Sequence, residues 1–206
     1  MFRSRSEQKR KSGSPSLRII AGTARGRRFD APEGMDTRPT LDRVKESLFG
    51  MLQFDIPGSR VLDLFSGSGN LGLEAASRGA ARVVCNDRSR DCAERIRTNA
   101  MLLGLGSQTE VLCLDYTDCL KQLGRESAVF DFAFLDAPYA DGTAQKAAEL
   151  LFSMGLIARN GRVIIEHAAN LAPDLDDSLA RLYDRRRYGN CAISVYGYSA
   201  PTGEEI

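Results

Sequence analysis

The sequence has little of what metal sites and disulfide-stabilised folds require. Its 206 residues include a single histidine, His167, and five scattered cysteines, none of which forms a CxxC pair. Because a structural zinc site needs four closely spaced ligands, we expect no bound metal. Several of the cysteines lie in apolar segments, where a free thiol behaves as a small core residue. Their odd number fits a reducing compartment.

Long apolar stretches are missing as well. No run of about 18 apolar residues is present, so we expect no membrane-spanning helix. The basic N-terminus is not followed by the apolar core of a signal peptide. These absences predict a cytoplasmic protein. The length suits one sizeable α/β domain with a small appendage, and a monomer is the default expectation.

The net charge of +1 conceals an uneven distribution. Residues 1–28 carry a local charge of +8, and the rest of the chain carries −7. A basic arm on an acidic body favours contact with phosphates. Residues 1–16 alone are rich in Ser, Lys and Arg, which equally favours a solvated, disordered arm.

The order of predicted elements divides the chain into three segments. These are a disordered basic arm at 1–16, a β-hairpin plus helix at 17–58 that faces the substrate, and a main domain at 59–200. The hairpin strands are predicted over 17–22 and 26–30. A helix over 41–53 is predicted because Leu41, Val44 and Leu48 recur at helical spacing.

In the main domain, strand patterns alternate with helix patterns, which is typical of a doubly wound, mostly parallel α/β sheet. Strands are predicted over 60–65, 82–86, 109–114, 130–136 and 161–166, and helices over 70–78, 89–103, 143–154 and about 174–181. The stretch 116–124 is too short to assign. Two further strands, 181–188 and 191–198, predict an antiparallel hairpin that completes a seven-stranded sheet.

A glycine-rich loop follows the first strand of this domain. Gly67, Gly69 and Gly72 match G-x-G-x-x-G, which lets the backbone turn tightly and approach a ligand. Alone, the pattern also fits an ordinary strand–helix turn. Asp87, about 20 residues further on, ends the next strand, where a carboxylate can accept both ribose hydroxyls. A carboxylate at a helix N-terminus is the plainer interpretation of Asp87.

Asp63, which lies just before the loop, helps to distinguish between two possible cofactors. A dinucleotide places its pyrophosphate at the helix N-terminus, and the carboxylate of Asp63 would repel it. Asp63 suits an ammonium or sulfonium instead, which favours S-adenosylmethionine over NAD. Asp115 and Tyr116 follow the third strand, where they would bind the adenine amino group and pack on the ring. An NAD-dependent oxidoreductase stays an alternative, and Asp115 also fits a plain loop residue.

A second motif, Asp136-Ala137-Pro138-Tyr139, follows the apolar run 130–135. The C-terminal ends of parallel strands are where open α/β sheets bind ligands. The Asp136 carboxylate and a backbone carbonyl can accept both hydrogens of an exocyclic amine, and the Tyr139 ring can stack on its plane. The motif therefore predicts a site for a planar group that carries an amine.

Together these motifs resemble class I S-adenosylmethionine-dependent methyltransferases of the [DN]-P-P-[YF] type. More narrowly, the chain resembles the bacterial RsmD family, which methylates N2 of a guanine in 16S ribosomal RNA. The narrower resemblance rests on four stretches: 17–22 with Gly26-Arg27, 38–49, 62–69, and Asn99. It implies a Rossmann-like fold and ribosomal RNA as partner, within a small-subunit particle. Ala137 stands where the family usually has proline, which costs preorganisation but keeps the carbonyl acceptor.

Three sets of site residues follow. The predicted catalytic residues are Asp136, Ala137, Pro138 and Tyr139. The predicted cofactor contacts are Thr40, Asp63, Phe65, Gly67, Gly69, Asp87, Arg88, Asp115 and Tyr116. The predicted RNA contacts are Arg18, Arg25, Arg27, Arg28 and Arg38; the resemblance also implies that Arg38 and Thr40 lie near the methionine end or the substrate.

Other functions use parts of the same pattern. A methyltransferase for DNA adenine or protein glutamine shares the amine chemistry, although the chain is small for a DNA sequence reader. A non-catalytic RNA-binding module would explain the basic arm alone. Arg185-Arg186-Arg187 fits a charged edge strand better than a second RNA contact. Glu166 and His167, at a strand end, fit structural hydrogen bonds better than catalysis.

Overall fold

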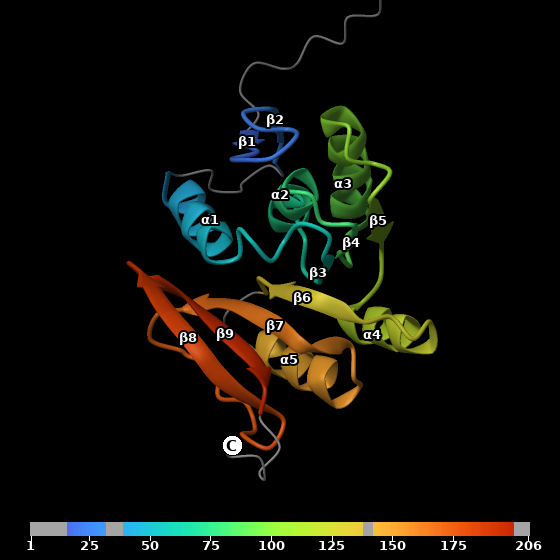
Figure 1. Ribbon diagram of the computed structural model, residues 1–206. Helices are drawn as coiled ribbons and strands as arrows, with labels where there is room; N and C mark the ends of the chain where they lie inside the picture. The colour runs from blue at the N-terminus through green and yellow to red at the C-terminus, as the bar shows by residue number, and fades with distance from the viewer. Residues whose placement is uncertain (1–15, 32–38, 138–141, 200–206) are drawn as a thin grey trace, which may run out of the picture.

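The computed structural model describes residues 16–31, 39–137 and 142–199. Figure 1 shows one mostly parallel sheet with helices on both faces and a small two-stranded sheet beside it. The arm predicted over 1–16 lies outside the described residues except for Ser16. In the described part of the chain, no helix is long and apolar enough to cross a membrane.

The main sheet has seven strands in the order β5-β4-β3-β6-β7-β9-β8. Their bounds are β3 Arg60–Asp63, β4 Arg82–Asn86, β5 Thr109–Leu112, β6 Phe130–Leu135, β7 Ile157–Ala168, β8 Ala180–Tyr188 and β9 Cys191–Tyr198. The first five in this order are parallel, and β9 runs antiparallel between β7 and β8. This places β8 and its arginines at an edge, as the sequence predicts.

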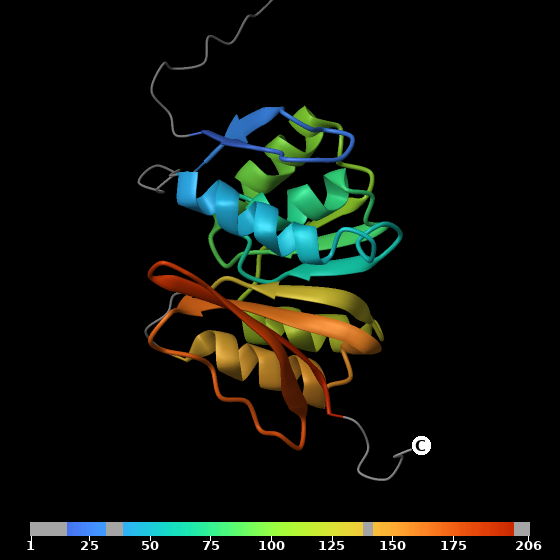
Figure 2. The same ribbon diagram turned by 60° about the vertical axis from the view of Figure 1, so that its left-hand side comes forward.

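Helices cover the two faces of the sheet separately. Their bounds are α1 Pro39–Met51, α2 Asn70–Ser77, α3 Arg90–Leu103, α4 Tyr116–Arg125 and α5 Thr143–Ser153. Strand residues alternate between faces: Val61 packs in the core under α1, α2 and α3, and Leu62 packs in the core under α4 and α5. Figure 2 shows these layers edge-on. The sheet is therefore buried on both faces, and its strand ends are left for a site.

The N-terminal hairpin is shorter than predicted. Strands β1 (Ser16–Arg18) and β2 (Arg28–Asp30) pair over three residues each. The chain between them leaves the ladder because α2 binds it: the Glu74 carboxylate accepts hydrogen bonds from the backbone N–H groups of Ile20 and Ala21, at 2.8 and 3.0 Å. The hairpin is thus docked on the outer side of α2 and α3.

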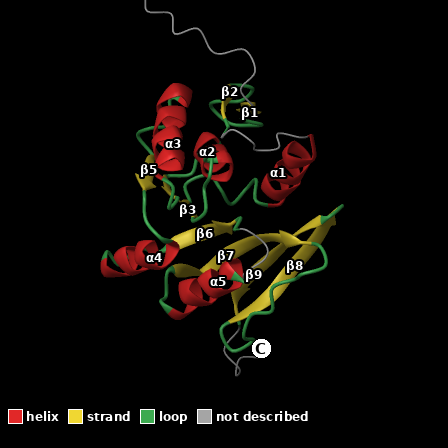
Figure 3. Cartoon of the chain, turned by 180° about the vertical axis from the view of Figure 1, so that it is seen from behind, coloured by secondary structure: helices red, strands yellow, loops and turns green. Residues whose placement is uncertain are grey.

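One predicted helix is wrong. No helix forms over 174–181; the segment is a loop that runs into β8 (Figure 3). The Asp176 carboxylate accepts from the backbone N–H of Ser178 at 2.8 Å, a local bond that competes with helix formation. Ala180, at the end of the segment, is buried as the first residue of β8. The unassigned stretch 116–124, by contrast, is helix α4.

Candidate active site

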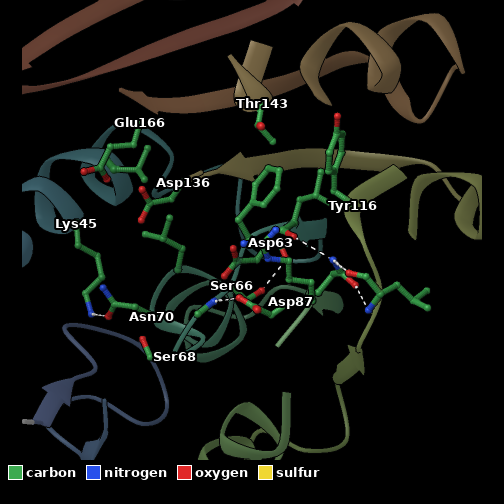
Figure 4. Close-up of a pocket in the computed structure, with 18 of the residues that line it drawn as sticks. Lys45, Asp63, Ser66, Ser68, Asn70, Asp87, Tyr116, Asp136, Thr143 and Glu166 are labelled. Atoms are coloured by element: carbon green, nitrogen blue, oxygen red, sulfur yellow. Dashed lines mark hydrogen bonds between the residues drawn. The ribbon is translucent and has the colours of Figure 1, made fainter. Parts of the chain in front are cut away.

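A pocket of about 590 Å³ lies at the C-terminal ends of the parallel strands. Residues at or near the C-terminal ends of β3, β4, β5, β6 and β7 line it, together with one face of α1. Figure 4 shows Asp136 and Glu166 on one side and Tyr116 on the other, with Asp63 between them. Sequence motifs that lie up to about a hundred residues apart therefore meet in one place, because parallel strands end at the same edge.

The glycine loop is built around two carboxylates. Gly67 and Gly69 have φ of +54° and +82°, which favours glycine at both turns. The Asp87 carboxylate accepts from the backbone N–H of Gly67 at 2.9 Å and from that of Ser89 at 2.8 Å. The Asp63 carboxylate accepts from the backbone N–H of Gly72 at 2.8 Å. Both side chains thus fix the loop as well as line the pocket.

Asp63 is a buried acid. Its side chain is 1% exposed. This burial raises the pKa of Asp63 to about 7, even though hydrogen bonds from Gly72 and Ser66 favour the carboxylate. A cation beside Asp63 would favour the ionised form, and an anion would oppose it. The group therefore fits a positively charged ligand and does not fit a pyrophosphate.

An aromatic pair closes the other side of the pocket. The rings of Phe65 and Tyr116 lie 5.7 Å apart at 47°. Asp115, the residue before Tyr116, caps α4 by accepting from the backbone N–H of Thr117 at 2.9 Å and from its hydroxyl at 2.8 Å. These bonds lower the pKa of Asp115. Asp115 and Arg88 both line the pocket, where they are exposed.

Of the motif predicted to be catalytic, residues 136–139, the structure describes the first two residues. Asp136 follows β6, is exposed to the pocket, and leads into buried Ala137. Pro138 and Tyr139 lie outside the described residues. The protein walls around Asp136 and the neighbouring carboxylates of Glu166 and Asp63 raise the pKa of Asp136 well above its ordinary value.

Sequence reasoning missed Lys45. Its ammonium donates to the side-chain oxygen of Asn70 at 2.8 Å and to the backbone carbonyl of Arg18 at 2.7 Å. It also pairs with Glu74, and burial lowers the pKa of Lys45. Lys45 and Asn70 line the pocket. The sequence does contain one indication of its role. Lys45 lies three residues before Leu48, so it is a charged residue on the apolar face of α1.

The predicted RNA contacts that the structure describes do not line the pocket. Arg27 donates to the backbone carbonyls of Leu102 and Leu103, the last residues of α3, at the end of that helix far from the pocket. Arg18 pairs with Asp42 at 2.9 Å. Arg28 donates to the Ser16 hydroxyl at 2.9 Å, and Arg25 is exposed in the hairpin turn. Arg38 lies outside the described residues, as does the side chain of Thr40.

His167 has the structural role that the sequence predicts. It is 5% exposed, and its ring nitrogens lie 2.8 Å from the carbonyl of Ala168 and from the hydroxyl of Ser194. Burial lowers the pKa of His167. Among the described residues, no group of three His, Cys, Asp or Glu side chains is placed to hold a metal ion.

Known proteins resemble the chain over most of its length. A family model described as conserved hypothetical protein 95 matches residues 17–197. Ribosomal RNA small subunit methyltransferase D of Haemophilus influenzae is 38% identical over 151 residues, which cover 73% of this chain and 78% of that protein. YlbH of Bacillus subtilis is 32% identical over 182 residues, 87% of this chain and 98% of that protein.

Solved structures share the fold. The structure of yhhF from Escherichia coli superposes with a TM-score of 0.79 at 29% identity and covers 90% of this chain and 99% of that one. The predicted fold class is confirmed: a doubly wound, mostly parallel sheet of the Rossmann-like methyltransferase type.

Proposed function

We propose, from the premise that this chain belongs to the conserved hypothetical protein 95 family, that it methylates ribosomal RNA with S-adenosylmethionine as the methyl donor. The target in this proposal is the exocyclic N2 amine of a guanine in small-subunit RNA. One observation carries it: Asp63, Asp87 and Asp136, from three adjacent strand ends, line one pocket. Relatives named ribosomal RNA small subunit methyltransferase D support the RNA class.

The pocket fits this cofactor. When bound, S-adenosylmethionine supplies a methyl group activated by a sulfonium. Asp87 would accept hydrogen bonds from the ribose hydroxyls, as acidic residues after the second strand of such sheets do. Burial raises the pKa of Asp63 to about 7, and a neighbouring cation favours its ionised form. Asp63 therefore matches the positive charge of the amino-acid tail. Phe65 and Tyr116 offer an apolar wall for the adenine, and Asp115 an acceptor for its amino group.

Asp136 and the carbonyl of Ala137 would act on the amine of the guanine by accepting its two hydrogens. The guanine amine is a poor nucleophile because its lone pair is delocalised into the ring. Two acceptors on its hydrogens favour a tetrahedral nitrogen and stabilise the positive charge that develops there. The raised pKa of Asp136 makes it a competent acceptor for the proton released afterwards. Tyr139 would stack on the base and help to align it.

The substrate has to present an unstacked guanine, at a cost of a few kcal/mol. Arg18, Arg25, Arg28 and Arg38 are proposed to hold phosphates, which gives salt-dependent affinity without sequence preference. The proposed substrate is a small-subunit particle, and the proposed active form is a monomer.

Nucleoside analysis of cellular RNA tests this function. Small-subunit RNA from cells that lack the gene should have lost N2-methylguanosine at one position. The wild-type gene should restore the modification, and Asp136→Ala should not. Asp118→Ala, which removes an exposed carboxylate of α4, is the matched control and should restore it. Unchanged N2-methylguanosine in the deleted strain would refute the proposed function.

A further inference from the structure

The register of β6 and β7 makes Glu166 and Asp136 neighbours. Strands β6 and β7 are parallel, and Leu135 is in register with Ile165. The next residue on each strand is therefore Asp136 on one and Glu166 on the other. Both line the main pocket, and Figure 4 shows them on the same side of it. Two carboxylates thus face the place where the amine of the substrate is proposed to lie.

Glu166 also borders a second cavity. This cavity, of about 230 Å³, lies between the end of β7 and the start of α5, and Thr143 and Glu166 line both it and the main pocket. Ala137 lines the second cavity and directly follows Asp136. The two spaces therefore adjoin at the catalytic motif, with room for a cofactor on one side and a planar base on the other.

The chemistry of guanine fits two adjacent acceptors. Its Watson–Crick edge carries the N2 amine and, next to it, the N1–H, so two hydrogen-bond donors lie side by side. Adenine and 2,6-diaminopurine have an unprotonated N1 at the same position, which is an acceptor. A carboxylate aimed at N1 therefore attracts guanine and repels the other two purines.

We propose that Glu166 accepts a hydrogen bond from N1–H of the target guanine, and so selects guanine over purines that carry a 2-amino group without that proton. The inference rests on the proposed function and adds the residue that distinguishes guanine from other bases. Asp136 and the carbonyl of Ala137 hold the amine, and Glu166 holds the neighbouring ring nitrogen. A site built around such a bond discriminates strongly, because the wrong base leaves a polar group unpaired.

Two other charged groups line the same pocket. Lys45 is the ammonium of α1 that lines the same pocket, and it is held by Arg18, Asn70 and Glu74. Asp63 is buried below Asp136 and hydrogen-bonded to Gly72. Glu166 is half-buried near the end of β7, lies in register beside Asp136 and lines both cavities, so it is the acid placed to meet the base.

A base-substitution experiment tests this role. Small-subunit particles are reconstituted with RNA that carries either guanine or 2,6-diaminopurine at the target position, and single-turnover methylation is measured. Wild-type protein should prefer guanine by at least about 100-fold. Glu166→Gln should reduce this preference at least about 10-fold, because its amide can donate to the unprotonated N1 of diaminopurine. Glu166→Asp keeps the carboxylate and should keep the preference for guanine at a lower rate.

Three outcomes are distinguishable. A reduced preference in Glu166→Gln, with unchanged binding of S-adenosylhomocysteine, supports the inference. An equal loss of rate on both bases overturns it, since that result assigns Glu166 to folding or to the electrostatics of Asp136. Failure of the wild-type protein to methylate the guanine overturns the proposed function, and this inference with it.

Discussion

Lys45 of α1 and Glu74 of α2 form an ion pair inside the protein, with Nζ and Oε2 3.4 Å apart and side chains that are 1% and 0% exposed. Glu74 also accepts from Arg78 at 2.8 Å and from two backbone N–H groups of the N-terminal segment. Lys45 reaches the carbonyl of Arg18 and the side chain of Asn70, which begins α2. This network joins the N-terminal segment to the helix that follows the glycine loop.

Glu74→Ala should lower the free energy of unfolding by about 3–5 kcal/mol, because it removes the counter-ion of a buried ammonium and the acceptor of two backbone N–H groups. Glu94→Ala is the matched control. Glu94 also pairs with an arginine four residues away, Arg90, but on the exposed surface of α3. Its loss should cost less than about 1 kcal/mol. Urea unfolding measures both, and equal losses would contradict a structural role for the buried pair.

Arg27 and Arg25 should behave differently although they lie two residues apart. Arg27→Ala removes hydrogen bonds to the last carbonyls of α3 and should lower the free energy of unfolding by about 1 kcal/mol. Arg25 is exposed, so Arg25→Ala should leave stability unchanged. It should weaken RNA binding and reduce the dependence of affinity on salt. If Arg25→Ala leaves the salt dependence of RNA binding unchanged, the hairpin turn does not contact RNA.

Asp63→Asn should stabilise the protein in a pH-dependent way. Burial raises the pKa of Asp63 in the folded state to about 7, so the folded protein holds this proton more tightly than the unfolded chain. Stability from this group is complete at low pH and is lost as the pH rises from about 4 to about 7. Removing the charge should restore up to about 4 kcal/mol at pH 8 and less at pH 5.

The same variant should bind S-adenosylhomocysteine more weakly, because the positive tail loses its carboxylate. Unfolding at the two pH values and calorimetric titration of the ligand separate these effects. A gain in stability that is the same at pH 5 and pH 8 would show that Asp63 does not titrate in this range.

Gly72→Ala should destabilise the protein by about 1–3 kcal/mol. A Cβ at this position would lie 2.5 Å from the sulfur of Cys85 and 3.1 Å from the Asp63 carboxylate. Gly50, in α1, has no atom within 4 Å of the same added carbon. Gly50→Ala should therefore raise stability by up to about 1 kcal/mol, as expected for alanine in a helix. Thermal unfolding compares the two variants. A Gly72→Ala variant as stable as the wild type would contradict the close packing of α2 against β3 and β4.

The sequence predicts the sheet and the pocket well because both depend on local patterns. Apolar runs mark β3, β4 and β6, and the polar residue that ends each of them necessarily reaches the same edge. Asp63, Asp87 and Asp136 come together for that reason. Glu166 reaches the same edge from a position two residues before the end of β7.

The errors and omissions involve long-range contacts. The segment 174–181 has residues compatible with a helix, but Ala180 pairs with β9 and Asp176 forms a local turn. The hydrogen bond from Arg27 to the end of α3 cannot be predicted from the sequence, because the two lie 76 positions apart. Lys45 is a charged residue on an apolar face, and its partner Glu74 is 29 positions away in a different helix. These contacts join residues far apart in the sequence, so a pattern within a short segment does not predict them.

Transfer of a tritiated methyl group by the purified protein tests the central claim most directly. The protein is given labelled S-adenosylmethionine with small-subunit particles from cells that lack the gene, and the RNA is digested to nucleosides. The account predicts label in N2-methylguanosine with wild-type protein, none with Asp136→Ala, and unchanged binding of S-adenosylhomocysteine by that variant. Label in another nucleoside, or undiminished label with Asp136→Ala, would contradict it.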